Sequence, residues 1–266
     1  QRFPELFTIF LANHQLLLSG NKVNKINSLE EIKLEISESL EEFDKLYYSD
    51  ELSELRSRYP RYVALYTPVI EEPDFAIIGT NPSWFIGKEP KDSIQNKMET
   101  ERTESLKKVH NINAYTKYKE PTYHKRVISF FSLYLHKSGL NNDSDQVERF
   151  IKENVMGWNS QFIQTGSSGY NNLKRFCMNK GGYFSKVFVK ANDIAIKITK
   201  LVKPKIIVHF GNPSREVSKE YVGEKIKKRE DFGYRVFFHH PSQGYSRVER
   251  EEDIDILRGL IERVKS

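Results

Sequence analysis

The stretch FAIIGTNPSWF, Phe75–Phe85, places a buried strand directly before a rigid polar turn. The apolar run from Asp74 to Ile78 predicts a strand that is buried on both faces, and Gly79 ends it. Pro82 fixes a φ angle and stiffens the turn, so the amide of Asn81 would be held at the end of a strand. A connecting loop needs only turn residues. The two aromatic residues that follow therefore make this turn a candidate ligand site.

Similar apolar runs recur along the chain between helical patterns. The further predicted strands are Val155–Ile163, KIIVHF (Lys205–Phe210) and YRVFF (Tyr234–Phe238), and helical spacing covers 127–135, 184–202 and 250–264. Strands that alternate with helices predict an α/β fold, a three-layer sandwich around a central, mainly parallel four-stranded sheet. Ligands bind such folds beyond the carboxyl ends of the strands. Four turns are expected to converge there: Gly79–Phe85, Asn159–Ser168, Gly211–Ser214 and His239–Arg247.

The first 70 residues differ in pattern from the rest. Ser28 and Glu31 form a capping box, and apolar residues then recur at helical spacing from Leu29 to Tyr47. We expect residues 1–70 to be an N-terminal helical extension and residues 71–266 to be the α/β domain. Within the extension, Tyr62–Val69 is compatible with a short strand or with the end of a helix.

Composition limits the class of protein. Hydrophobic residues make up 38% and charged residues 29%, which favours a packed core with a solvated surface. No apolar run approaches the roughly 20 residues that span a bilayer. The single cysteine, Cys177, excludes an intramolecular disulfide and cannot alone hold a structural zinc or an iron–sulfur cluster. We expect no cofactor, no metal and no membrane partner, and a cytoplasmic, nucleoid-associated location.

Charge is distributed unevenly. The net charge is +6, yet Leu29–Glu54 holds ten acidic and two basic residues, whereas Lys107–Arg126 holds six basic and one acidic. A basic surface attracts polyanions, of which nucleic acid is the commonest. A solvated charged surface remains the alternative.

A second candidate motif is FFHHPSQGYSR, which follows the last predicted strand. His240 would place an imidazole near developing negative charge, and Ser242 would bind a phosphate through its hydroxyl and backbone N–H. Tyr245 and Arg247 would grip a nucleic-acid backbone. A capped turn with a packed histidine remains open as the alternative.

Taken together, the two motifs resemble those of the uracil-DNA glycosylase superfamily. In that superfamily a first strand ends in Gly-x-Asp/Asn-Pro, which GTNPS resembles in its Asn form, and a late strand ends in His-Pro-Ser, which His240–Ser242 matches. GWNSQFIQT is similar to the central strand whose Asn reads the base, which is Asn159 here. KITKLVKPKIIVHFGNPSREV is similar to the helix, strand and helix that precede the last strand. The resemblance covers residues 74–264.

The resemblance implies a monofunctional DNA glycosylase that acts on a flipped-out base in DNA repair by base excision. Asn81 would position the attacking water and His240 would donate a hydrogen bond to the base carbonyl, so these two residues would be catalytic. DNA, duplex or single-stranded, would be the partner of a monomeric protein without a cofactor. The implied base-binding residues are Gly79, Thr80, Trp84, Phe85 and Asn159. The implied DNA-binding residues are Ser83, Ser242, Gln243, Gly244, Tyr245, Arg247, Lys117 and Lys119.

Two departures from the family pattern keep the base open. Ser83 stands where Asn-type members carry Gly, and Gln243 stands where Pro is common. The substrate would be a uracil-like or modified pyrimidine base, and the alternative is a bulky modified cytosine of phage DNA in anti-phage defence. A module that binds nucleic acid or a nucleotide without cleavage is a further alternative. A third takes 88–120 and the acidic helix as surfaces for protein interaction.

The segment NAYTKYKEPTYHKR also has two interpretations. Its interleaved tyrosines and basic residues suit a channel for single-stranded nucleic acid or a flipped base. Tyrosines packed beneath a solvated loop are the alternative.

Overall fold

One mixed sheet organises the part of the chain that the structure describes. The computed structural model describes residues 28–59, 61, 64–79, 113–117, 122–163, 169–210, 226–229, 233–238 and 246–266. The strand order is β2-β1-β3-β5-β4. The strands are β1 (Phe75–Gly79), β2 (Val155–Asn159), β3 (Ile206–Phe210), β4 (Ile226–Lys228) and β5 (Tyr234–Phe238).

Four of these strands run parallel, as the sequence predicts. β2, β1, β3 and β5 pair in parallel register, and β4 pairs antiparallel with β5 at the edge of the sheet. The α/β class and the mainly parallel sheet are therefore confirmed. β4 was not predicted, because a three-residue strand with two lysines has no apolar run to reveal it. The predicted strand Val155–Ile163 is too long, since β2 ends at Asn159.

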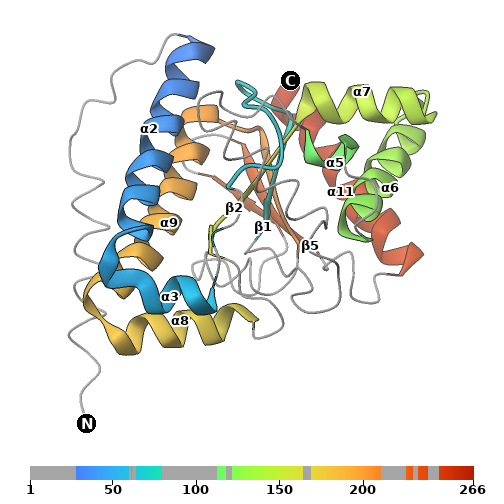
Figure 1. The fold of residues 1–266 in the computed structure, drawn as a ribbon. Helices are drawn as coiled ribbons and strands as arrows, with labels where there is room; N and C mark the ends of the chain where they lie inside the picture. The colour runs from blue at the N-terminus through green and yellow to red at the C-terminus, as the bar shows by residue number, and fades with distance from the viewer. Residues whose placement is uncertain are drawn as a thin grey trace.

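Helices cover both faces of the sheet and make three layers (Figure 1). One hydrophobic core joins the sheet to α2, α3, α8 and α9, and a second core joins it to α5, α6, α7 and α11. The first group is α2 (Leu29–Tyr47), α3 (Ser53–Arg58), α8 (Gly169–Lys180) and α9 (Gly182–Val202). The second group is α5 (Ala114–Lys117), α6 (Thr122–Lys137), α7 (Ser144–Asn154) and α11 (Arg247–Lys265). A 3-10 turn, η1 (Asp50–Leu52), links α2 to α3.

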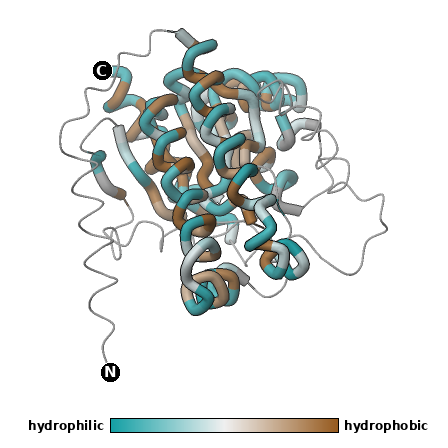
Figure 2. The backbone as a smooth tube through the Cα atoms, turned by 60° about the vertical axis from the view of Figure 1, so that its left-hand side comes forward, coloured by the Kyte–Doolittle hydropathy of each residue, from teal (hydrophilic) through white to brown (hydrophobic). Residues whose placement is uncertain are grey.

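Alternation along the strands explains why both faces are covered. In β1, Ala76 and Ile78 enter the first core, whereas Phe75 and Ile77 enter the second. Strands that are buried on both faces read as continuous apolar runs, which is why β1 and β3 stand out in the sequence. Along the helices, hydrophobic and hydrophilic residues instead alternate, because each helix buries one face only (Figure 2).

Local signals in the sequence set the helix ends. Ser28 caps α2, and its hydroxyl accepts a hydrogen bond from the backbone N–H of Glu31 at 3.2 Å. Asp143 caps α7 in the same way. α9 ends at Val202, where Lys203 adopts a left-handed conformation. The sequence also predicts a short helix around residues 100–109 and a helix that starts near Ser214, and both lie outside the described residues.

The described part of the predicted N-terminal extension shares the core of the sheet. α2 packs against α9 (Figure 1), and its apolar face lies in the same hydrophobic cluster as Ala76 and Trp158. After α3 the chain returns to the sheet, where Leu65 forms a β-bridge to Trp158 and Arg61 forms one to Ile163. None of the residues 64–69 is helical. The division of the chain at residue 70 stays a prediction.

Candidate functional site

The carboxyl ends of the four parallel strands meet at one edge of the sheet. Gly79 of β1 is the register partner of Asn159 of β2, and Ile78 is the partner of His209 in β3. Phe210 in turn pairs with Phe238 at the end of β5. Two of the predicted turns begin at the last residue of a strand, Gly79 or Asn159, and the other two begin one residue after a strand, at Gly211 and His239. The register therefore supports the convergence that the sequence predicts.

Most of the predicted site residues follow these strand ends and lie outside the described residues, and their roles stay predictions. They are Thr80, Asn81, Ser83, Trp84, Phe85, Lys119, His240, Ser242, Gln243, Gly244 and Tyr245. Gly79, Lys117, Asn159 and Arg247 are described.

Asn159 is the best-defined polar side chain at this edge. Its side chain is buried, and its Oδ1 accepts a hydrogen bond from the hydroxyl of Tyr66 at 3.2 Å. Its backbone N–H donates to the carbonyl of Ala64 at 2.9 Å. Both contacts come from the chain segment that follows α3. A buried amide with a fixed partner can present a defined pattern of donor and acceptor to a ligand.

Gly79 gives the Asn159 amide the space that it occupies. A Cβ built on Gly79 would lie 2.9 Å from Asn159 Oδ1, closer than Cβ contacts normally come. The carbonyl of Gly79 also accepts a hydrogen bond from the backbone N–H of Ser160 at 2.8 Å. The predicted base-binding residues Gly79 and Asn159 are thus in contact, and the glycine is needed for this close approach rather than for a turn alone.

Sequence reasoning missed the contribution of residues 64–67, which lie along β2. Tyr66 donates its backbone N–H to the carbonyl of Gly157 at 2.7 Å, and Thr67 Oγ1 accepts from the N–H of Gly157 at 3.0 Å. The segment belongs to the region that has no match in the family resemblance. Only its pairing with β2, which is about ninety residues away, reveals that it contributes to the site.

Two aromatic rings pack against Tyr66, the partner of Asn159. The ring centroids of Tyr66 and Tyr115 are 5.6 Å apart, and that of His124 lies 6.0 Å from Tyr66. Tyr115 rests on the backbone of Gly157, where a Cβ would meet its Oη at 2.5 Å. Burial raises the pKa of Tyr66 to about 12 despite its hydrogen bond to Asn159, so the hydroxyl keeps its proton at neutral pH.

Tyr115 therefore follows the packed interpretation of its segment rather than the channel interpretation. It is fully buried in the core on the α6 side of the sheet. Lys117 ends the short helix α5. Tyr118 lies outside the described residues, as does Lys119, and the predicted DNA contacts of both lysines stay predictions.

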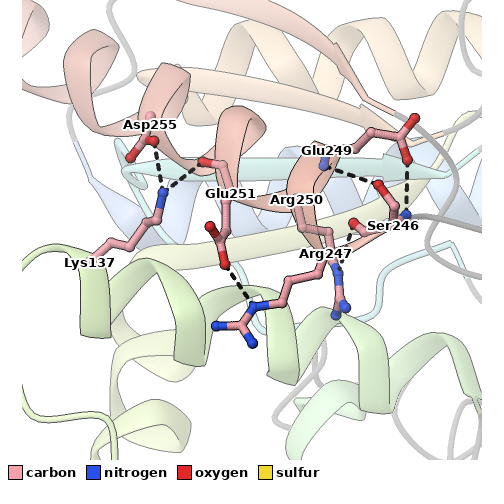
Figure 3. A network of polar contacts seen from close by, with 7 residues as sticks. All are labelled: Lys137, Ser246, Arg247, Glu249, Arg250, Glu251 and Asp255. Atoms are coloured by element: carbon pink, nitrogen blue, oxygen red, sulfur yellow. Dashed lines mark hydrogen bonds and ion pairs between the residues drawn. The ribbon is translucent and has the colours of Figure 1, made fainter.

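Arg247 lies on the surface at the start of α11 (Figure 3). Its side chain is 82% exposed, and its Nε donates to Glu251 Oε1 at 2.8 Å, one turn along the helix. Ser246 caps the helix in a full capping box with Glu249. An exposed pair of this kind is weak, so the guanidinium can exchange Glu251 for another anion. The predicted contact of Arg247 with DNA is compatible with this position.

His209 is a buried polar residue that sequence reasoning also missed. It lies one residue before the end of β3, and its ring stacks on Phe237 with centroids 5.1 Å apart. Within the described residues, neither ring nitrogen has a hydrogen-bond partner. Burial, reinforced by the positive charge of Arg235, lowers the pKa of His209 well below its ordinary value. The sequence KIIVHF predicted only a buried strand.

A shallow hollow lies away from this edge. It has a volume of about 490 Å³ and lies between α6 and the start of α7, lined by residues such as Ser129, His136 and Asn142. None of its lining residues belongs to a strand end. Among the described residues, no group of three His, Cys, Asp or Glu side chains is arranged to hold a metal ion. In the same part of the chain, no helix is long and apolar enough to cross a membrane.

No protein-family model matches this chain, and no curated protein matches it in sequence.

Proposed function

We propose that this protein is a DNA glycosylase that hydrolyses the N-glycosidic bond of a flipped-out, uracil-like or modified pyrimidine base. The observation that supports the proposal most is the contact between Gly79 and Asn159. It joins the end of the first motif strand to the amide expected to read the base, at the edge of the sheet where ligands bind α/β folds.

The strand order supports a shared site for the two catalytic residues. β1, which leads into Asn81, and β5, which leads into His240, are separated by β3 alone. Because neighbouring strands lie about 4.8 Å apart, the two strand ends are about 10 Å apart. Each catalytic residue follows its strand end by two positions. Short connections of this length can bring both side chains to one ligand.

The proposed chemistry divides the work among three side chains. Asn81 positions the water that attacks the sugar, and His240 donates a hydrogen bond to the base carbonyl as negative charge develops there. Asn159 reads the hydrogen-bonding edge of the base. Basic residues, among them Arg247 at the start of α11, hold the DNA backbone through their charge.

The test is direct assay for abasic sites. The protein is incubated with DNA that contains uracil, mismatched bases or bulky cytosine derivatives, and alkali-labile sites are measured. We expect cleavage of at least one substrate, and a loss of about 100-fold or more in rate for Asn81→Ala and His240→Ala. Far-UV circular dichroism and thermal unfolding check that both variants remain folded.

The chain offers matched controls for both variants. Asn212 belongs to a second Asn-Pro-Ser sequence after β3, and His239 precedes His240. Neither is assigned a catalytic, base-binding or DNA-binding role, so Asn212→Ala and His239→Ala should lose far less activity than Asn81→Ala and His240→Ala. Full activity of Asn81→Ala and His240→Ala would refute the assigned roles. Salt-dependent DNA binding without abasic product from any substrate would favour a binding module instead.

A further inference from the structure

Resting on the proposed function, we propose that Tyr66 is a positioning residue for base recognition. Its hydroxyl holds the Asn159 amide in one of its two flipped orientations, and so sets the donor and acceptor pattern that this amide presents to a base. Tyr66 lies outside the region that resembles the glycosylase superfamily, so the resemblance does not supply this element of the site.

The contact itself is short and buried. Tyr66 Oη lies 3.2 Å from Asn159 Oδ1, and both side chains are at most 6% exposed. Water cannot readily replace a hydrogen-bond partner at such depth. Removing the partner of a buried amide therefore either lowers the free energy of unfolding or makes the amide reorient. In the structure this hydroxyl acts as the donor to the amide oxygen.

The hydroxyl is held in place from several directions. The backbone N–H of Tyr66 donates to Gly157, and the N–H of Asn159 donates back to Ala64, so the two chain segments are tied together on both sides of the contact. The rings of Tyr115 and His124 pack against the Tyr66 ring. A side chain fixed by both its backbone and its ring can fix a second side chain in turn.

Gly79 also lies close to this amide oxygen. Asn159 Oδ1 lies where a Cβ on residue 79 would come within 2.9 Å. The amide oxygen is therefore bounded by Tyr66 Oη and by the backbone of Gly79. In this geometry the amide oxygen faces Tyr66 and Gly79, and this orientation determines where the amide nitrogen lies.

A fixed amide can distinguish pyrimidines that differ in hydrogen-bonding pattern. Uracil presents an N3–H donor and an O4 acceptor, whereas cytosine presents an N3 acceptor and an N4–H donor. Turning an amide by 180° exchanges its donor and acceptor. If Tyr66 holds one orientation, the protein prefers one of the two patterns. Without Tyr66 the amide can adopt both orientations, and the preference weakens.

The experiment compares Tyr66→Phe with Tyr47→Phe. Tyr47 is also buried before residue 70, and its hydroxyl donates to the carbonyl of Tyr59 at 2.7 Å, so it loses an equivalent hydrogen bond far from Asn159. The probes are oligonucleotides with one 2′-fluoro nucleotide that carries uracil or cytosine, which resists hydrolysis. The ratio of the two Kd values measures base discrimination.

We expect the Kd ratio to move toward one by about two- to tenfold in Tyr66→Phe, the worth of one hydrogen bond, and to stay unchanged in Tyr47→Phe. The side-chain amide NMR signal of Asn159, identified through its loss in Asn159→Asp, should shift in Tyr66→Phe alone. Equal ratios in wild type and Tyr66→Phe, a wild type that does not discriminate, or an unmoved Asn159 signal would each overturn the proposal.

These outcomes are separate from those of the glycosylase test. A protein that discriminates the two probes through Tyr66 but forms no abasic site contradicts the proposed hydrolysis and supports the role of Tyr66. A protein that forms abasic sites with the same base preference in wild type and Tyr66→Phe supports the hydrolysis and contradicts the role of Tyr66.

Discussion

Buried polar side chains are treated differently beside β2 and within β3. Beside β2, Arg61 pairs with Asp44 and Asn159 accepts from Tyr66, so each polar group has a partner. On β3, His209 has no hydrogen-bond partner among the described residues. The difference follows from chemistry: a guanidinium cannot lose its charge, whereas an imidazole can become neutral.

The comparison also separates two purposes of a buried polar group. The groups beside β2 are held in a defined orientation, which is what a recognition site requires. The lowered pKa of His209 keeps its ring neutral, and the neutral ring packs face to face on Phe237. Three substitutions test this distinction.

Arg61→Ala should have the largest effect. Arg61 Nε lies 2.7 Å from Asp44 Oδ1, and the guanidinium carbon lies 4.7 Å from the ring centroid of Phe43 and 5.3 Å from that of Phe162. Removing the cation leaves a carboxylate without its partner at a largely buried position, which costs about 3–5 kcal/mol. Urea unfolding monitored by circular dichroism measures the loss in free energy of unfolding.

The matched control for that variant is Arg58→Ala. Arg58 pairs with Glu54 at 3.1 Å, but both side chains are exposed, so little change is expected. A loss for Arg61→Ala no greater than that for Arg58→Ala would contradict the role of the buried pair.

Gly157→Ala should have an intermediate effect. The new Cβ would lie 2.5 Å from Tyr115 Oη and push the ring that supports Tyr66. Overpacking of this kind costs about 1–3 kcal/mol in free energy of unfolding. Gly259→Ala in α11 is the control, since an added Cβ there meets nothing within 4 Å. If Tyr115→Leu fails to recover any stability in the Gly157→Ala background, the clash has been placed wrongly.

His209→Phe should have the smallest effect, which we expect in the pH dependence of the free energy of unfolding. The folded pKa of His209 lies below the unfolded value of about 6.5, so the unfolded state binds the extra proton first. The stability due to neutral His209 is complete above about pH 6.5 and is lost as the pH falls, by up to about 1.4 kcal/mol per pH unit. The variant should lose less stability than the wild type between pH 6.5 and 5.

Unfolding free energies measured across that pH range provide the comparison. His136 is exposed on α6, and His136→Phe should keep the slope of the wild type. Identical slopes for wild type and His209→Phe would show that the buried ring does not govern the acid sensitivity.

The sequence predicted the elements that have local signals. The runs FAIIG, IIVHF and YRVFF are apolar enough to define β1, β3 and β5, and Ser28 marked the start of α2. Asn159 and Gly79 were selected through a motif, and the register brings them into contact. Their mutual packing could not be predicted, because it depends on a distance between strands rather than on either sequence.

Other features escaped prediction because they depend on contacts far apart in the chain. Tyr66 reaches Asn159 only when residues 64–67 lie beside β2, and the sequence of these residues is compatible with several structures. His209 was recognised as part of a buried run, but the sequence around it could not show that its ring lacks a hydrogen-bond partner among the described residues. The surroundings of these two residues therefore depend on contacts between distant parts of the chain, which local sequence patterns do not specify.

The position of residues 64–67 beside β2 also bears on aggregation. β2 is the outermost strand on its side of the sheet, and its sequence, VMGWN, is almost wholly apolar. A strand edge of this kind readily pairs with another chain when nothing covers it. At the opposite side the sheet ends in β4, which is three residues long and carries two lysines. A fragment that began at residue 71 would thus expose an apolar edge, and we expect self-association to be its first defect.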